Sequence, residues 1–284
     1  MTARTVQVTV PAVEADLAAD ALWQAGAAAI EERPAAGASA GVVVLVAAAP
    51  GGDPDPGPLL AAVSGRWPAE VVAVDVETAL DAWRDHARPV VVGDRLVVRL
   101  AGEPGPGTLV VDPGRSFGSG AHPSTLLVLE ALVELVAGGE RVLDVGSGSG
   151  ILALAALALG AAEALAVDID PAAQAATAAN AERNGLAGRV TVAEAVSGRH
   201  DLVVANLLLP DHRALAPAVA AAVAGGGTLV VSGVLAEQRD AVAGAYGAAG
   251  LVVVGERRAE GWLTTIWRPS RRMCDVRDAK SRLR

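Results

Sequence analysis

The chain has 284 residues, of which 52% are apolar and only 2% aromatic, so alanine, valine and leucine must fill its core. Its uninterrupted apolar runs are shorter than the roughly 18 residues that cross a bilayer, and residues 1–5 lack the apolar core of a signal peptide. With one cysteine, Cys274, an internal disulfide is excluded, and we expect a cytoplasmic protein.

The formal net charge of −9 is unevenly distributed. Residues 271–284 hold six basic and two acidic side chains, a net of +4, so the rest of the chain carries −13. An acidic surface repels phosphate backbones and attracts basic partners, which argues against a nucleic-acid substrate and favours a lysine-rich protein. An acidic surface that only aids solubility is about equally compatible with the charge.

The first 77 residues predict a small α+β domain. Strands are predicted over 6–10, 28–32, 42–47 and 71–76, and helices over 14–25 and 59–63. The order β-α-β-β-α-β is the ferredoxin-like split motif. Acidic side chains outnumber basic ones by ten to three in residues 4–77, and such a domain more often binds a partner than performs chemistry. We therefore expect residues 1–77 to recognise the substrate.

Residues 78–111 are predicted to form a linker and a small β region. Alternation over 90–98 predicts a hairpin that turns at Gly93 and Asp94. Trp83 and His86 are candidates for lining a substrate cleft. The slightly favoured alternative is that Trp83 separates two domains while His86 lies on the surface.

The segment 112–125 concentrates glycine and small polar residues, and it contains the only phenylalanine, Phe117. Pro123 suits the first position of a helix that runs to about residue 136, with His122 at its cap. Thr125 then falls in the first turn, where its hydroxyl and nearby N–H groups are suited to an anionic ligand group. The alternative is that Thr125 only satisfies its own helix end.

The stretch 142–150 predicts a buried strand, a glycine-rich turn and the start of a helix. Gly146, Gly148 and Gly150 allow the backbone to bend sharply and to approach a ligand closely. The next strand ends in Asp168, about twenty residues on, where nucleotide-type sites place a carboxylate that holds a ribose. Alternate glycines followed by such an acid are typical of S-adenosylmethionine (SAM) methyltransferases, whereas G-x-G-x-x-G marks dinucleotide sites. A Rossmann-like turn without SAM is the alternative.

From residue 140 onward, strand and helix patterns alternate. The predicted strands are about 141–145, 164–168, 189–193, 201–206, 227–232, 251–256 and 261–267, and the helices lie near 150–160, 171–183, 211–224 and 236–249. Only a few residues link the last two strands, so these must be antiparallel. This predicts the seven-stranded α/β architecture of class I methyltransferases over 112–268, followed by a basic tail, 269–284, that we expect to be disordered.

Asn206 ends a predicted strand on the same rim as Gly146 and Asp168, because ligands bind beyond the carboxyl ends of strands in an open α/β sheet. Its side-chain oxygen is suited to orienting an amine. Leu207 and Leu208 follow, where enzymes that methylate flat amides or bases carry Pro-Pro-aromatic, so a flexible alkyl amine is the better substrate. The alternative for Asn206 is a turn residue after a strand.

Together these residues resemble the ribosomal protein L11 methyltransferase family over nearly the whole chain up to about residue 268. The most specific stretch, 112–125, is D-P-G-R-S-F-G-S-G-A-H-P-S-T and is similar to the family's D-P-G-x-A-F-G-T-G-x-H-x-T-T. Further agreement lies in 143–152, 167–171, 180–185 and 204–208. Ser119 and Ser124 replace threonines, and the N-terminal domain is poorer in aromatics than the family pattern.

The resemblance implies a SAM-dependent protein methyltransferase that modifies the N-terminal amine and lysine side chains of ribosomal protein L11. The N-terminal domain would hold the substrate. The family's SAM contacts map to Thr125, Gly146, Asp168 and Asn206; we add Gly148 and Phe117 to the cofactor site and assign Asn206 a catalytic role as well. We expect no metal, no direct contact with nucleic acid or membrane, and a monomer.

Two alternatives stay open. Related enzymes methylate lysines of an electron-transfer flavoprotein subunit, and an acidic N-terminal domain suits either protein. A non-catalytic SAM-binding protein is the other, although an intact glycine loop with Asn206 argues against it.

Overall fold

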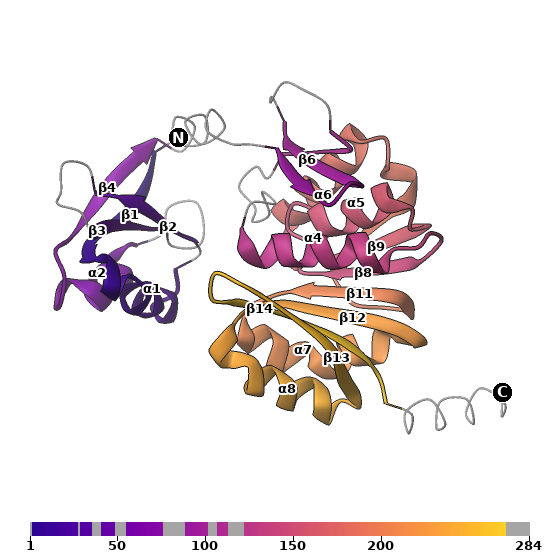
Figure 1. Ribbon diagram of the computed structural model, residues 1–284. Helices are drawn as coiled ribbons and strands as arrows, with labels where there is room; N and C mark the ends of the chain where they lie inside the picture. The colour runs from indigo at the N-terminus through magenta and orange to yellow at the C-terminus, as the bar shows by residue number, and fades with distance from the viewer. Residues whose placement is uncertain are drawn as a thin grey trace. The chain divides into compact units, whose positions relative to one another are not determined.

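The computed structural model describes residues 2–27, 29–35, 41–48, 55–75, 89–101, 107–112 and 122–270 (Figure 1). The chain forms two compact units, Met1–His86 and Ala87–Arg284. Among the residues singled out in the sequence, Trp83, His86 and Phe117 lie outside the described residues, as does most of the basic tail. The expected domain boundaries at residues 77 and 111 stay predictions.

The first unit has the expected β-α-β-β-α-β order. Its elements are β1 (Thr2–Pro11), α1 (Ala15–Gln24), β2 (Ala29–Pro34), β3 (Val42–Ala48), α2 (Gly57–Ser64) and β4 (Ala69–Asp75). The strands pair antiparallel in the spatial order β2-β3-β1-β4, which is the order of the split motif. Val6, Val8 and Leu45 of the sheet pack with Leu22 and Leu59 of the helices in one buried cluster.

The second unit is built on a seven-stranded sheet. Its strands are β8 (Arg141–Val145), β9 (Glu163–Val167), β10 (Val190–Ala193), β11 (His200–Asn206), β12 (Val223–Leu235), β13 (Leu251–Ala259) and β14 (Trp262–Pro269). They lie in the order β10-β9-β8-β11-β12-β14-β13, with β14 antiparallel to both neighbours. The predicted parallel sheet with an antiparallel end is confirmed. The chain order reverses between β8 and β11, so ligands are expected beyond the carboxyl ends of these strands.

Helices cover both faces of this sheet (Figure 1). They are α4 (Pro123–Leu135), α5 (Ile151–Leu159), α6 (Pro171–Arg183), α7 (Leu209–Ala222) and α8 (Arg239–Ala248). One apolar cluster joins α4 and α5 to the sheet, and a second joins α7 and α8 to the opposite face. The second unit is therefore a three-layer α/β sandwich, with the sheet between two layers of helices.

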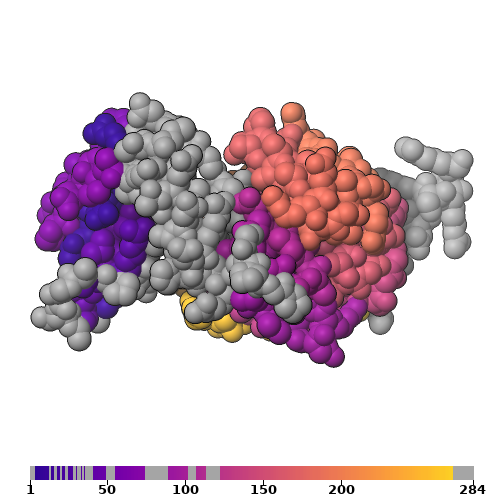
Figure 2. Space-filling view, turned by 90° about the horizontal axis from the view of Figure 1, so that it is seen from above, coloured from indigo at the N-terminus to yellow at the C-terminus, as the bar shows by residue number. Residues whose placement is uncertain are grey.

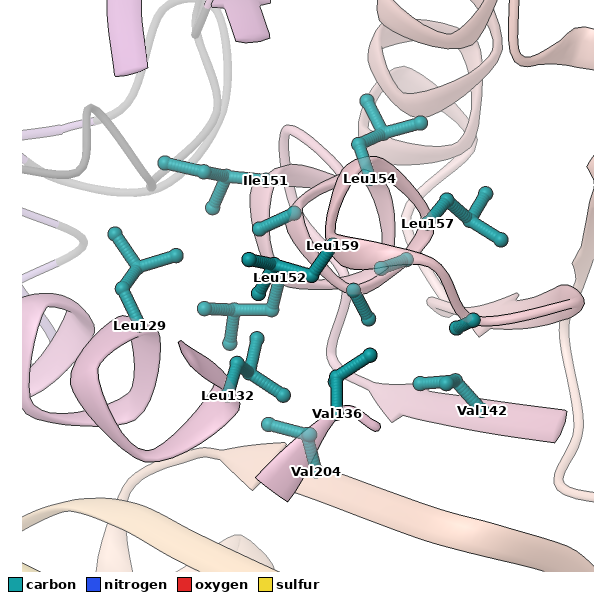
Figure 3. Packing of buried hydrophobic residues seen from close by; sticks show 14 of the residues in the cluster. Leu129, Leu132, Val136, Val142, Ile151, Leu152, Leu154, Leu157, Leu159 and Val204 are labelled. Carbon is teal, nitrogen blue, oxygen red and sulfur yellow. The ribbon is translucent and has the colours of Figure 1, made fainter. Parts of the chain in front are cut away.

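Helix α5 is apolar all round because it is buried all round. Its sequence has no polar side chain, and eight of its nine residues are buried. Figure 3 shows its side chains spreading in several directions, with Leu152 toward Leu132 of α4 and Leu157 on the other flank. This packing fixes the helix that follows the glycine loop, and so it fixes the end of the loop.

A small sheet precedes α4. It comprises β5 (Val90–Val92), β6 (Leu96–Leu100) and β7 (Leu109–Val111). The predicted hairpin at Gly93 and Asp94 is confirmed, whereas β7, parallel to β6, was not expected. The sheet packs against α5 and α6, and Figure 2 shows its magenta surface bordering the salmon surface of the second unit.

Candidate active site

The glycine loop joins β8 to α5 where the strand order reverses. Gly146, Gly148 and Gly150 all have positive φ, at 74°, 54° and 79°, a region that other residues rarely adopt. A Cβ at Gly146 would collide with Cδ2 of Leu207, and one at Gly150 would lie 2.8 Å from Cγ2 of Thr177. Both the backbone conformation and close packing therefore require glycine here.

The N–H groups of the loop are engaged within the protein. Those of Gly146 and Ser147 donate to the carbonyl of Val167 at 2.8 and 3.0 Å, and that of Gly148 donates to Oδ2 of Asp168 at 2.9 Å. A glycine turn before a helix commonly points its N–H groups at a ligand, but here those of Gly146, Ser147 and Gly148 are already bonded within the protein. The backbone group of Gly146 that can bind a ligand is its carbonyl oxygen, which accepts hydrogen bonds from a donor such as an ammonium group.

Asp168 lies half-buried at the end of β9. Its Oδ2 accepts the Gly148 N–H, and its Oδ1 accepts the N–H of Asp170 at 3.0 Å. An ionised carboxylate has about four lone-pair sites, so acceptor capacity remains for ligand hydroxyls. The next side chain, Ile169, is 88% exposed, which leaves an apolar surface beside the carboxylate.

The N-terminus of α4 forms the expected cap. His122 is the N-cap residue and Pro123 the first helical residue. The Ser124 N–H donates to Nδ1 of His122 at 3.3 Å, and those of Thr125 and Leu126 donate to its carbonyl at 2.9 Å. The expectation of N–H groups left for an anionic ligand is therefore wrong for these three residues.

Asn206 and Thr125 meet at the opposite side of the rim, although they are 81 positions apart. Asn206 Nδ2 donates to Oγ1 of Thr125 at 3.4 Å. Because Thr125 accepts this bond, its own hydroxyl hydrogen can still be donated to a ligand. The Asn206 Oδ1 is buried and has no hydrogen-bond partner among the described residues. A buried acceptor of this kind is costly unless something completes it.

Two leucines follow Asn206 on the rim. Leu207 lies against Gly146, and Leu208 is 50% exposed. A Cβ at Gly233, which has φ of 82°, would lie 2.8 Å from Oδ1 of Asn206. Among the described residues, the backbone at Gly233 therefore lies close to the Asn206 oxygen, and two aliphatic residues follow Asn206 in the chain.

Asp144 lies beneath the glycine loop in β8 and is fully buried. Its Oδ2 accepts the N–H of Ala153 at 3.1 Å, while Oδ1 has no partner among the described residues. Burial raises the pKa of Asp144 to about 7; the bond from Ala153 offsets this in part, and the charge of Asp168 adds to it. Asp144 was not among the predicted site residues, although an acidic residue inside an apolar strand was a usable signal.

A buried polar network supports the Asn206 side of the rim. The Ser232 carbonyl accepts the Leu207 N–H at 3.1 Å and Nε2 of His212 at 2.8 Å, and Nδ1 of His212 lies 2.9 Å from the Tyr246 hydroxyl. The Ser232 hydroxyl donates to the carbonyl of Ser124 at 3.0 Å. Ser232 therefore joins the segment after Asn206 to the helix turn that carries Thr125.

The donor set fits SAM. Asp168 has acceptor capacity for a ribose, and the Gly146 carbonyl can accept from an ammonium group. Thr125 can donate its hydroxyl hydrogen, and Asn206 has an unpaired acceptor beside it. In the described part of the chain, three metal-ligating side chains nowhere gather into a group that would hold an ion. Over the same residues, the helices are too short or too polar to cross a membrane.

The sheet order, the glycine loop and the carboxylate at the next strand end define a SAM-dependent methyltransferase of class I. The family model for ribosomal protein L11 methyltransferase matches residues 66–269. The chain accordingly belongs to the ribosomal protein L11 methyltransferase family.

Individual relatives agree with this assignment. The chain is 43% identical over 207 residues to the ribosomal protein L11 methyltransferase of Symbiobacterium thermophilum, covering 70% of this chain and 68% of the relative. It is 39% identical over 229 residues to that of Geobacter sulfurreducens, covering 78% and 73%. The crystal structure of ribosomal protein L11 methylase from Lactobacillus delbrueckii subsp. bulgaricus has a TM-score of 0.60 at 26% identity, covering 65% of this chain and all of that one.

Proposed function

We propose that this protein transfers methyl groups from SAM to ribosomal protein L11, at its N-terminal amine and at lysine ε-amines, and that it works in the cytoplasm as a monomer. Membership of the family supports the substrate. The observation that carries the chemistry is the buried Oδ1 of Asn206, which lacks a partner among the described residues at the point where the strand order reverses.

The cofactor supplies a methyl group on a positively charged sulfur, so the acceptor nitrogen must present a lone pair to it. On the cofactor side, Asp168 accepts hydrogen bonds from the ribose hydroxyls, and the Gly146 carbonyl and the Thr125 hydroxyl bind the amino-acid part. Gly148 contributes by donating its N–H to Asp168 at 2.9 Å, which fixes the carboxylate. Phe117 is assigned to the same site from the resemblance alone.

On the acceptor side, Oδ1 of Asn206 accepts an N–H of the incoming amine. This bond completes the unpaired oxygen and turns the nitrogen lone pair toward the methyl group. Asn206 is itself held by its 3.4 Å bond to Thr125, so the acceptor's orientation is fixed by the group that also binds the cofactor. Catalysis rests on positioning two reactants in line, which is a large effect without any covalent intermediate.

The amine must be neutral before it reacts. A lysine side chain has an unperturbed pKa of about 10.4, so at neutral pH it is protonated in water. We assign the removal of water from the amine to the aliphatic side chains of Leu207 and Leu208, and desolvation near a cation lowers an amine pKa. The proton is then released to solvent before transfer.

The acidic first unit suits a basic substrate. In residues 4–77, ten acidic and three basic side chains give a field that attracts a lysine-rich protein. We assign substrate recognition to residues 1–77 on this ground, with residues 78–111 as linker and small β region and residues 112–268 as the methyltransferase domain.

The test is intact-mass spectrometry of purified L11 incubated with this protein and SAM. The expected result is a series of mass steps of one methyl each, at the N-terminus and lysines in peptide maps. A second candidate substrate, an electron-transfer flavoprotein subunit, is offered in parallel because the same charge argument applies to it. Label on the flavoprotein alone would overturn the L11 assignment, and SAM binding without transfer to either protein, or to any protein in a cell lysate, would favour a non-catalytic role.

A further inference from the structure

Helix α6 carries two fully buried polar side chains, Thr177 and Asn180, where its other buried residues are alanines. Thr177 Oγ1 donates to the carbonyl of Gly148 at 3.0 Å, and Asn180 Nδ2 donates to the carbonyl of Ser149 at 2.9 Å. Two consecutive carbonyls of the glycine loop are therefore held from α6 by side chains one turn apart.

Asn180 makes a second set of bonds that Thr177 does not. Its Nδ2 also donates to the carbonyl of Asp112 at 2.8 Å, and its Oδ1 accepts the Asp112 N–H at 2.8 Å. The Oδ1 accepts the Arg183 Nη1 as well. Both hydrogens and both lone pairs of the amide are thus in use, and of the side chains of this length only an amide offers two donors and two acceptors.

The two partners of Asn180 belong to different parts of the site. Ser149 lies in the glycine loop, whereas Asp112 begins the segment 112–125 that ends at Thr125 beside Asn206. One buried side chain therefore fixes the start of this segment to the loop that the cofactor approaches. The side-chain amide of Asn180 therefore sets the distance between the backbone at Asp112 and the backbone at Ser149.

We propose that Asn180 is a positioning residue for SAM binding, acting through the glycine loop and Asp112 and not by touching the cofactor. The inference rests on the proposed function of this rim as a SAM site. Without the amide, the Ser149 carbonyl and both backbone groups of Asp112 lose buried partners, so the loops relax or admit water. Affinity falls because binding must then restore an arrangement that the native protein already holds.

Asn184 provides a matched control. It is the C-cap residue of α6, and its amide makes the same paired bonds to a strand backbone, with the Val110 N–H at 2.8 Å and the Val110 carbonyl at 2.7 Å. Its Nδ2 also donates to the backbone carbonyl of Asn180 at 2.7 Å, a bond that does not involve the Asn180 side chain. It has no bond to Asp112 or to the glycine loop among those the structure records. Replacing it removes a similar number of hydrogen bonds without uncoupling the two parts of the site.

The experiment is calorimetric titration of wild-type protein, Asn180→Ala and Asn184→Ala with SAM, together with thermal unfolding and amide hydrogen exchange of the cofactor-free proteins. Both variants should lose thermal stability. Asn180→Ala should raise the Kd for SAM by about ten-fold or more, which is the loss of about one buried hydrogen bond, whereas Asn184→Ala should stay within about two-fold. Exchange at the Asp112 amide should accelerate only in Asn180→Ala.

Equal SAM affinity in Asn180→Ala and wild type, or an equal loss in both variants, would overturn the role of Asn180. If Asn180→Ala does not fold, Asn180→Ser takes its place, and unchanged affinity there overturns the proposal equally. Wild-type protein that does not bind SAM would overturn the proposed function and this inference together, an outcome that the titration of wild type alone distinguishes.

Discussion

The two halves of the rim are built differently. Around β8 and β9, the Gly148 N–H, the Ser149 carbonyl and the Asp168 carboxylate all have partners inside the protein. Around β11 and β12, the Asn206 oxygen has no partner among the described residues, and the side chain of Leu208 is half exposed. We name these the cofactor half and the acceptor half after their proposed roles. On the cofactor half these three groups are bonded before a ligand arrives, although Oδ1 of the buried Asp144 beneath the loop has no partner among the described residues, whereas on the acceptor half the unpaired oxygen lies on the rim itself.

This difference matches what each half must do. A cofactor common to every turnover is bound best by a preorganised site, since less free energy is then spent on ordering it. An acceptor that differs from one lysine to the next needs a site with few fixed contacts, and one oriented acceptor oxygen supplies that. Changes on the two halves should therefore separate cofactor affinity from turnover.

Substitution of Asn206 is expected to give the largest difference between the effect on turnover and the effect on SAM affinity. Asn206→Ala removes the oxygen that orients the amine, so we expect turnover at saturating SAM to fall by about 100-fold, while the Kd for SAM changes by only a few-fold. Rates with labelled SAM and calorimetry measure the two quantities. Asn206→Asp keeps an acceptor oxygen and should retain more activity than the alanine variant. A larger effect on SAM affinity than on turnover would place Asn206 in the cofactor half.

The buried acid of the cofactor half should make stability depend on pH. With its folded-state pKa raised from 3.8 to about 7, Asp144 binds more protons folded than unfolded between these values. Its contribution to stability is therefore lost as pH rises through that window. Asp144→Asn does not titrate, so its unfolding free energy should rise relative to that of wild type by about 3 kcal/mol between pH 4 and pH 7.

Denaturant unfolding at several pH values between 4 and 8 measures this difference. Only the difference between the two proteins is informative, because burial lowers the pKa of His212 and gives the opposite slope below its ordinary value of 6.5. Parallel pH profiles for Asp144→Asn and wild type would show that Asp144 does not titrate in this range.

Substitution of Asp168 is expected to have the opposite effect, changing SAM affinity more than turnover. Asp168→Ala removes the proposed ribose acceptor and the partner of the Gly148 N–H, so the Kd for SAM should rise by about ten-fold while turnover at saturation falls less. Asp170→Ala is a matched control, because that carboxylate caps α6 through Ala172 at 2.8 Å and makes no bond to the loop. Equal SAM affinity in wild type and Asp168→Ala, by calorimetry, would refute the assignment.

The sequence predicted the features that follow local rules. Apolar periodicity predicted the sheet, a short final connection predicted its antiparallel end, and His122 was expected at a helix N-cap. Strand β7 was missed because three residues give too short a pattern, and its backbone is paired partly by the Asn184 side chain from 74 positions away.

The site was predicted less completely than the fold. Glycine spacing and strand ends brought out Gly146, Asp168 and Asn206, but hydrogen-bond partners 68 or 81 positions apart are not readable from one sequence. The wrong expectation of available N–H groups has the same cause, since a pattern shows a helix start but not which acceptor already occupies it. Asn180 was visible only as part of a family motif.

The smallest effect on stability and turnover is expected from substitution of Tyr246, which is joined to the acceptor half through His212 and Ser232. The Nε2 of His212 faces the Ser232 carbonyl and therefore carries the hydrogen, so Nδ1 accepts from the Tyr246 hydroxyl. Burial keeps both groups neutral, since it lowers the pKa of His212 and raises that of Tyr246. Tyr246→Phe leaves Nδ1 without its donor and should cost about 1 kcal/mol of unfolding free energy.

The Ser232 carbonyl also accepts the N–H of Leu207, which is next to Asn206. Loss of the Tyr246 hydroxyl should therefore lower turnover more than it lowers SAM affinity. Thr265→Val is the control. Its hydroxyl is equally buried and accepts the Trp267 indole N–H at 2.7 Å, so it should lose comparable stability while turnover stays near wild type. If both variants lower turnover equally, the network supports the fold in general and has no particular connection to the acceptor half.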